Sequence, residues 1–446
     1  MSRVLIGALL LTACTVAADP QTRNSSESEA DIGTSQPVQG SLAPTMREVV
    51  DRLLAGIYTP EWDVEAIGDL VDLGDVRVTW LLADLMRFYQ SGPAYDELVL
   101  AFSNLTGASQ DNSEVGFVWA TNHLISRDLP AYDGYPEDKA RVFTPIEDLW
   151  QQFFDQSVSV DWRMVTWGGV LADDRPLDAN TQCNCIPALD HPVTTDASGG
   201  DWYPDDRVVF GVVVGDEAIA LPKHQMEVHE MVNLTLGGRE LGIPYCTLCG
   251  SAQAYYVDTS GVARLVLRTS GLLQRSNKLM YDLTTGSAID TFTGEALTGP
   301  LATQGVVLEQ VSVVASSWGD WKASHPMTRI LAQDGGLGRT YEEDPLGGRD
   351  DDGPIFPVGD VDPRLPVQEK VVGVVTHDDQ PIAFPVTATR SELVSGPIEY
   401  QGLTVRFEDS IRVYDEDGNE LTSHEAFWFA WSQFHPTTII WDSVGS

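Results

Sequence analysis

The sequence predicts an α+β protein in which a small, HEAT-like helical domain precedes a β-rich domain containing two related, unequal copies. From residue 46 to residue 110, apolar side chains recur at three- and four-residue spacing, which is the pattern of amphipathic helices. After residue 167, apolar runs and alternating segments bounded by glycine and aspartate turns are typical of strands. A tryptophan-rich motif that occurs twice in this second part predicts the two copies.

The composition limits the classes of partner. The chain has 446 residues, of which 43% are hydrophobic, enough to form a sizeable core. Acidic residues number 66 against 27 basic ones, which gives a formal net charge of −39. Such a charge repels nucleic acid and anionic membrane surfaces, so we expect no nucleic-acid partner. Because the acidic residues are scattered along the chain, we interpret them as a solvated surface.

The first 13 residues have the features of a signal peptide, with Arg3 ahead of a short apolar run. That run is too short to span a membrane, and Cys14 follows it in a context that resembles the bacterial lipobox. We therefore expect an exported protein that is attached to the cell envelope only through a lipid on Cys14. An ordinary signal peptide with an incidental Cys14 is the alternative. Residues 14–45 are polar with almost no aromatic side chains, and they predict a disordered tether after the lipidated cysteine.

Four apolar clusters within residues 46–110 predict short antiparallel helices, separated by turns such as Gly74 and the Gly92-Pro93 step. We interpret this segment as a packing domain, with a docking surface for a protein partner as the alternative. Residues 111–166 are rich in aromatic side chains and predict a partly helical connector.

The motif WGDWKASHP at 318–326 recurs as WFAWSQFHP at 428–436. In each motif the two tryptophans are three residues apart, on one face of a helix that the His-Pro step ends. We therefore interpret His325 and His435 as architectural. The predicted organisation is a first β-rich unit with the cysteine site, an acidic linker rich in glycine and proline, and a second, shorter unit without cysteines, at residues 167–335, 336–370 and 371–446.

The segment Cys246-x-x-Cys249-Gly has the sequence of a metal knuckle, because the glycine lets the backbone curl so that amide groups point at the sulfurs. His229 adds a possible imidazole ligand, and Met226 lies one helical turn before it on the same face. Two thiolates with an imidazole or a thioether suit Cu or Zn, so we expect a soft or borderline metal here. Glu230 is expected behind the ligands as an acceptor or proton carrier, and it is the candidate catalytic residue.

The same cysteines also fit disulfides, since four remain besides Cys14 and the chain is expected to be exported. Pairing Cys183 with Cys185 would close a very small ring, so the easier disulfide joins this pair to the Cys-x-x-Cys motif. Alternatively, Cys183 and Cys185 would complete a four-sulfur metal site. A thioredoxin-like role is less favoured, because residues 252–257 have strand character and provide no helix N-terminus to stabilise a thiolate.

Several motifs in order resemble a known family, the domain of unknown function 3179. They are IPALDHP at 186–192, HEMVN at 229–233, YCTLCGSA at 245–252, SGLLQRSNKLMYDLTTGS at 270–287 and WGDWKASHP at 318–326. The resemblance implies a bacterial or archaeal, often exported protein, without an established activity, and it points to His229, Cys246 and Cys249. The chain departs from the family pattern at Leu234, where an acidic residue is usual, and at Ile289, where a tryptophan is expected.

These observations favour an exported lipoprotein whose Cys/His site binds Cu or Zn for metal handling or metal-assisted chemistry. A disulfide-stabilised structural or interaction module without metal, or a thiol-disulfide redox protein, is the alternative. The sequence contains no nucleophile elbow, Walker loop, dinucleotide fingerprint or His-Glu-x-x-His motif, and it assigns no enzyme class.

Overall fold

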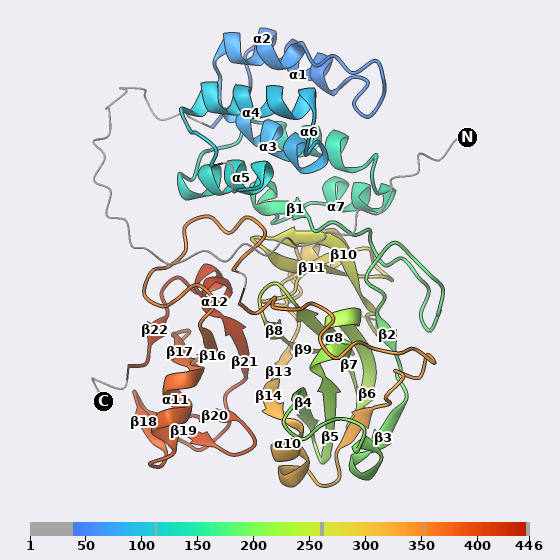
Figure 1. The fold of residues 1–446 in the computed structure, drawn as a ribbon, viewed down its shortest axis with the longest axis vertical. Helices are drawn as coiled ribbons and strands as arrows, with labels where there is room; N and C mark the ends of the chain where they lie inside the picture. The colour runs from blue at the N-terminus through green and yellow to red at the C-terminus, as the bar shows by residue number, and fades with distance from the viewer. Residues whose placement is uncertain (1–38, 112–113, 259–262, 352, 443–446) are drawn as a thin grey trace. The chain divides into compact units, whose positions relative to one another are not determined.

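The computed structural model describes residues 39–111, 114–258, 263–351 and 353–442. The signal peptide, Cys14 and most of the tether that the sequence predicts lie outside these residues. Helices form the first part of the described chain (Figure 1). They are α1 (Pro44–Leu54), α2 (Ala66–Leu73), α3 (Thr79–Phe88), α4 (Pro93–Thr106), α5 (Gly116–Ser126), α6 (Tyr135–Phe143) and α7 (Gln151–Asp155).

Local sequence explains where these helices begin and end. Pro44 and Pro93 each stand at the first turn of a helix, where the fixed backbone angle of proline is already helical. Gly74 and Gly107 end α2 and α4 in the left-handed conformation that glycine adopts without steric cost. Helix α3 is buried along almost its whole length and contacts α4, α5 and α6, so it forms the centre of the helical region.

The described residues after the helices form five small sheets in a propeller-like set. The first has the strand order β1 (Val165–Trp167), β10 (Leu267–Gln274), β11 (Asn277–Asp282), β12 (Ala288–Asp290). The second has the order β13 (Gln310–Val311), β9 (Ala254–Tyr256), β7 (Arg239–Cys246), β6 (Met231–Leu236), β2 (Leu189–Asp190), and β8 (Ser251–Ala252) also pairs with β7.

The third sheet has the order β14 (Val314–Ser317), β4 (Val208–Val214), β5 (Glu217–Pro222), β15 (Arg329–Leu331), β3 (Thr194–Asp196). The fourth has the order β21 (Ser423–Phe427), β16 (Lys370–Val375), β17 (Pro381–Pro385), β22 (Ile439–Ile440), and the fifth β18 (Ile398–Tyr400), β19 (Leu403–Phe407), β20 (Ile411–Tyr414). Five short helices lie among the sheets: α8 (Lys223–His229), α9 (Gly299–Thr303), α10 (Trp318–Ser324), α11 (Val386–Leu393) and α12 (Trp428–Phe434).

The prediction that the β-rich part consists of two related, unequal copies is wrong, because its strands form five sheets. Each copy of the repeated motif belongs to one sheet, the first copy to the third sheet and the second copy to the fourth. Four strands of the third sheet, in the order β14, β4, β5, β15, correspond to the strands β21, β16, β17, β22 of the fourth sheet. In each set the fourth strand pairs in parallel with the third, β15 with β5 and β22 with β17. The first, second and fifth sheets extend the fold beyond these two similar sheets, so the motif describes one sheet and its helix rather than half a domain.

Each motif folds in the same way. The Trp321 indole donates a hydrogen bond to Thr328 Oγ1 at 2.9 Å, and the Trp431 indole donates one to Thr438 Oγ1 at 2.8 Å. Helices α10 and α12 end immediately before the two histidines of the motif. The tryptophans are fully buried, so the repeated motif specifies how a short helix packs on its sheet.

The helical region and the first sheet share one apolar core. Leu272, Leu279 and Tyr281 of β10 and β11 belong to the same buried cluster as the side chains of α3 and α6. The first sheet is thereby held from the helical side, and its β10–β11 turn projects toward the cysteine motif at the end of β7. No helix within the described residues is long and apolar enough to cross a membrane.

Candidate functional site

The Cys-x-x-Cys-Gly motif forms a tight knuckle between β7 and β8. The amide of Cys249 donates a hydrogen bond to the carbonyl of Cys246 at 3.2 Å. Gly250 follows with a φ of +60°, and a Cβ atom at this position would lie 2.9 Å from the Phe427 ring. Both requirements select glycine, as the motif predicts. Both cysteines are free thiols, and their side chains are buried.

The two sulfurs lie side by side. The Cys249 thiol donates a hydrogen bond to the Cys246 sulfur. The carbonyl oxygen of Ser276 lies 3.5 Å from Cys249 Sγ and 3.9 Å from Cys246 Sγ. Burial disfavours the Cys246 thiolate, but the hydrogen bond from Cys249 and the ammonium of Lys278 outweigh it, and the pKa of Cys246 is lowered. Burial and the hydrogen bond to Cys246 raise the pKa of Cys249 well above its usual range.

A buried ion pair lies beside the sulfurs. Lys278 Nζ is 3.0 Å from a carboxylate oxygen of Glu230 and also donates to the Glu230 carbonyl. Thr247, inside the knuckle, donates to the same carboxylate at 2.9 Å. Glu230 ends helix α8 with a φ of +52°, which is the left-handed region. The sequence-predicted Glu230 is thus brought to the cysteine pair, together with Lys278, which sequence reasoning did not assign to the site.

His229 is not brought to the two sulfurs. Its Nδ1–H donates to the carbonyl of Pro187 at 2.7 Å, and its Nε2 accepts from the Tyr341 hydroxyl at 2.8 Å. Burial lowers the pKa of His229 to about 4, so the ring is neutral at pH 7. The predicted weaker ligand, Met226, is fully buried in an apolar cluster that includes Tyr245.

Cys183 and Cys185 form a disulfide with each other, which corrects the expectation that they cross-link to the Cys-x-x-Cys motif or complete a four-sulfur site with it. The loop is held by hydrogen bonds to the carbonyls of Asn184 and Ile186, and the Cα atoms of the two cysteines lie 5.1 Å apart. That separation is within the ordinary range for a disulfide, so pairing across a single intervening residue needs no distant partner.

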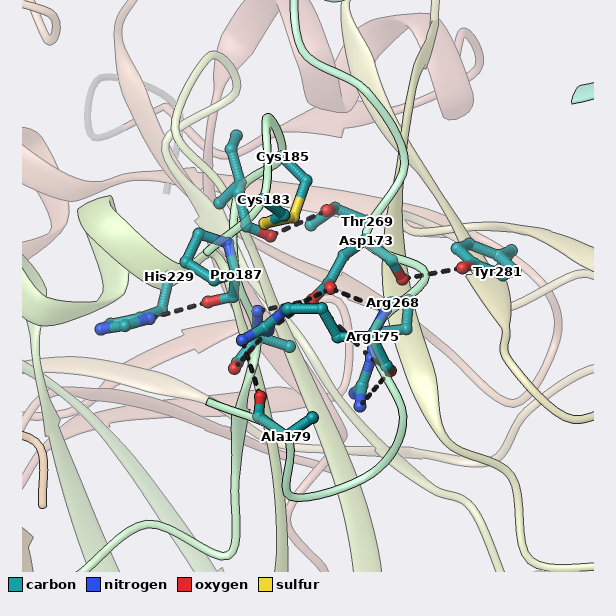
Figure 2. Close-up of a disulfide and its surroundings, with 12 residues drawn as sticks. Asp173, Arg175, Ala179, Cys183, Cys185, Pro187, His229, Arg268, Thr269 and Tyr281 are labelled. Carbon is teal, nitrogen blue, oxygen red and sulfur yellow. Dashed lines mark hydrogen bonds and ion pairs between the residues drawn. A yellow bond between two sulfur atoms is a disulfide. The ribbon is translucent and has the colours of Figure 1, made fainter. Parts of the chain in front are cut away.

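Among the described residues, the group whose metal-ligating atoms lie within 4.8 Å of one another is Asp173, Cys183 and Cys185. This group has little free donor capacity. The two sulfurs are bonded to each other, and the Asp173 carboxylate accepts hydrogen bonds from Arg175 at 2.6 and 2.7 Å (Figure 2). Ala188 N–H donates to the same carboxylate at 2.9 Å. The arrangement therefore does not favour a metal while the disulfide is present.

The structure adds a polar surrounding to the dithiol that sequence reasoning missed. Six buried side chains near the knuckle have polar atoms without a hydrogen-bond partner in the described chain: Ser251, Gln253, Ser276, Asn277, Asp290 and Thr291. In folded proteins, the large majority of buried polar side-chain atoms are paired. The signals in the sequence are the polar residues Ser251 and Gln253 shortly after Gly250 and the polar residues around the β10–β11 turn.

The pairing of the strands explains why these groups lie near the cysteines. Ser251 is opposite Cys246 in the β7–β8 pair, and Asp290 is opposite Leu279, next to Lys278. The charge of Asp290 contributes to the raised pKa of the Cys249 thiol. Burial in turn raises the pKa of Asp290 to about 6. The site is therefore a reduced dithiol that packs in an apolar cluster with Phe292 and Phe427 and has polar side chains from three segments of the chain near it.

Fold and site together define an α+β protein with a helical region, five small sheets and a buried Cys-x-x-Cys pair. The model of the family described as protein of unknown function (DUF3179) matches residues 183–409, which is more than half of the chain and includes the whole knuckle. The chain belongs to this family. Neither the curated proteins nor the solved structures contain a match to this chain.

Proposed function

We propose that Cys246 and Cys249 bind one soft or borderline metal ion, Cu(I) or Zn(II), and that the protein serves in metal handling or metal-assisted chemistry. The observation that supports this proposal best is the pair of reduced, adjacent sulfurs in a buried position. Thiolates are the ligands that select these metals in proteins. The proposal assigns no ligand role to His229, because both of its ring nitrogens have other partners.

Charge balance supports a cation at this position. Lys278 and Glu230 neutralise each other, so ionisation of both thiols would leave two buried negative charges without a counter-charge. A bound Cu(I) would compensate one of these charges, and a bound Zn(II) would compensate both. The polar side chains around the knuckle would supply further oxygen donors to Zn(II) or hydrogen bonds to the thiolates.

Burial argues against the alternative in which this dithiol exchanges with disulfides of other proteins. Cysteines with that activity lie in partly exposed positions, where a partner sulfur can approach in line. Here Cys246 is 2% exposed and Cys249 is 0% exposed, and the Phe427 ring covers the glycine that follows them. A single metal ion needs far less open surface than a protein partner does.

The test is metal analysis of protein purified without chelators and kept reduced. We expect about one Cu or Zn ion per chain, as for a single closed site. Cys246→Ser and Cys249→Ser should each lose it, whereas a Cys183→Ser/Cys185→Ser variant, which removes the other cysteine pair, should keep it. A reduced, folded protein that neither contains nor takes up Cu(I) or Zn(II) would show that the buried pair is structural.

We also propose that the protein is exported and attached to the cell envelope by a lipid on Cys14. The support for this is the signal-peptide-like composition of residues 1–13 and the lipobox-like context of the cysteine. We further propose that the helical region can bind a protein partner.

A further inference from the structure

A cavity of about 630 Å³ opens beside the loop that carries the second cysteine pair. Its wall includes Cys183 and Cys185, and it is also lined by Gly335, Gly336, Leu337 and Arg339. Both cysteines are only half-buried, in contrast to Cys246 and Cys249. The disulfide is therefore accessible to a small molecule that enters this cavity.

The disulfide closes a very short loop, so we expect it to contribute little to the free energy of unfolding. A disulfide stabilises mainly by restricting the unfolded chain, and this effect decreases as the closed loop becomes shorter. Here a single residue, Asn184, separates the two cysteines.

The loop is also held independently of the disulfide. The amide of Leu171 donates to the Asn184 carbonyl at 2.9 Å. Thr269, which Figure 2 shows beside the disulfide, donates through Oγ1 to the Ile186 carbonyl at 3.0 Å. One bond is accepted by the residue between the two cysteines and the other by the residue directly after Cys185, and neither involves a sulfur atom. The loop is thus expected to keep its position when the disulfide is reduced.

The lining of the cavity indicates which small molecules it accepts. Asn180, Thr181 and Gln182 offer polar side chains to the cavity. Its two carboxylates already have partners, since Asp178 is hydrogen-bonded to His191 and Asp190 is paired with Arg268. Arg339 brings a cation to the cavity. Arg175 is already paired with Asp173, whereas no carboxylate of the described residues forms an ion pair with Arg339, whose guanidinium lies over the Tyr341 ring at 5.4 Å. An arginine without an acidic partner can bind the carboxylate of a ligand through charge-assisted hydrogen bonds.

We propose that the Cys183–Cys185 disulfide is a redox site for low-molecular-weight thiols that carry a carboxylate, with Arg339 binding the carboxylate. The thiolate of the first molecule attacks one cysteine sulfur, the disulfide bond breaks, and the other cysteine leaves as a thiolate that takes up a proton. A second thiol molecule attacks the mixed disulfide and releases the first as a disulfide of the small molecule. Two electrons and two protons pass from two small thiols to Cys183 and Cys185.

The test compares two thiols of similar size, 3-mercaptopropionate with a carboxylate and 2-mercaptoethanol without one. The native protein is treated with each, quenched with a maleimide, and mapped by mass spectrometry, which separates Cys183 and Cys185 from the buried pair. Rates are corrected for the thiolate fraction of each reagent. We expect reduction with the folded state retained by circular dichroism, and a rate for 3-mercaptopropionate roughly two- to fivefold higher, the range of an exposed ion pair.

Two variants isolate the contribution of Arg339. Arg339→Gln should abolish the preference for 3-mercaptopropionate without changing the rate with 2-mercaptoethanol, and Arg339→Lys should restore part of the preference. Equal corrected rates for the two reagents in the wild type would overturn the assignment of a carboxylate-bearing thiol. A disulfide that is reduced only when the protein unfolds would overturn the redox site itself.

Discussion

The backbone N–H of Phe427 donates a hydrogen bond of 2.8 Å to the carbonyl of Cys249. This bond connects the fourth sheet directly to the cysteine knuckle of the second sheet. The ring of Phe427 also packs against Gly250, so the same residue contacts the knuckle through its backbone and its side chain. The fourth sheet contains no cysteine, and its contribution to the site is to cover the dithiol and exclude water.

Gly250→Ala tests this cover. The substitution introduces a Cβ atom 2.9 Å from the Phe427 ring and also places alanine at a φ of +60°. Gly215→Ala is the matched control, because Gly215 has a φ of +58° with nothing within 4 Å of the added atom. Urea denaturation should give a loss of about 1 kcal/mol for the control and about 2 kcal/mol more for Gly250→Ala. Equal losses would mean that Phe427 does not constrain the knuckle.

Lys278→Met tests the ion pair beside the sulfurs. It leaves the Glu230 carboxylate buried without its counter-charge, and we expect a loss of about 3–5 kcal/mol in the free energy of unfolding. In a Glu230→Gln/Lys278→Met variant both charges are absent, so its loss should be smaller than the sum of the two single losses. Denaturant titrations of the four proteins at one pH measure this coupling, and strictly additive losses would contradict a direct pair.

His229 predicts a pH dependence of stability. Its pKa is about 4 in the folded protein against 6.5 for the ordinary side chain, so above pH 6.5 the ring is neutral in both states. As the pH falls from 6.5 to 4, the unfolded chain binds a proton that the folded protein does not, and stability decreases by about 3 kcal/mol over the whole window.

The measurement compares wild type and His229→Gln, because other buried histidines contribute to the total pH dependence. The wild type should lose more stability than the variant between pH 7.5 and pH 4.5, and the difference between the two proteins is the contribution of His229. Parallel curves for the two proteins would show that His229 takes up its proton equally well in the folded state.

The proposed lipid anchor at Cys14 is tested by fractionation and mass spectrometry. The wild-type protein should sediment with membranes, and Cys14→Ser should shift it to the soluble fraction, because the substitution removes the thiol that the proposed lipid would modify. A mature N-terminus that begins after residue 14, or an unmodified Cys14, would contradict the anchor.

Local features of this protein followed from the sequence alone. The spacing of the cysteines and the following glycine determined the knuckle, because both are requirements of one short turn. The apolar periodicity of the helical region and the His-Pro ends of α10 and α12 are local in the same sense. The family could also be recognised, since its motifs are short and occur in order.

Only the tertiary structure decided which groups meet at the sulfurs. Lys278, Asp290 and Phe427 reach the knuckle through strand pairing and packing between sheets, which depend on register and on contacts between distant segments. Because the backbone at Glu230 is left-handed, the side chains of His229 and Glu230 point to different surroundings. Glu230 pairs with Lys278 beside the sulfurs, whereas His229 is hydrogen-bonded to Tyr341. The number of sheets could not be predicted from the sequence either. A repeated motif specifies how one helix packs on one sheet, and it carries no information on how many other sheets the chain forms.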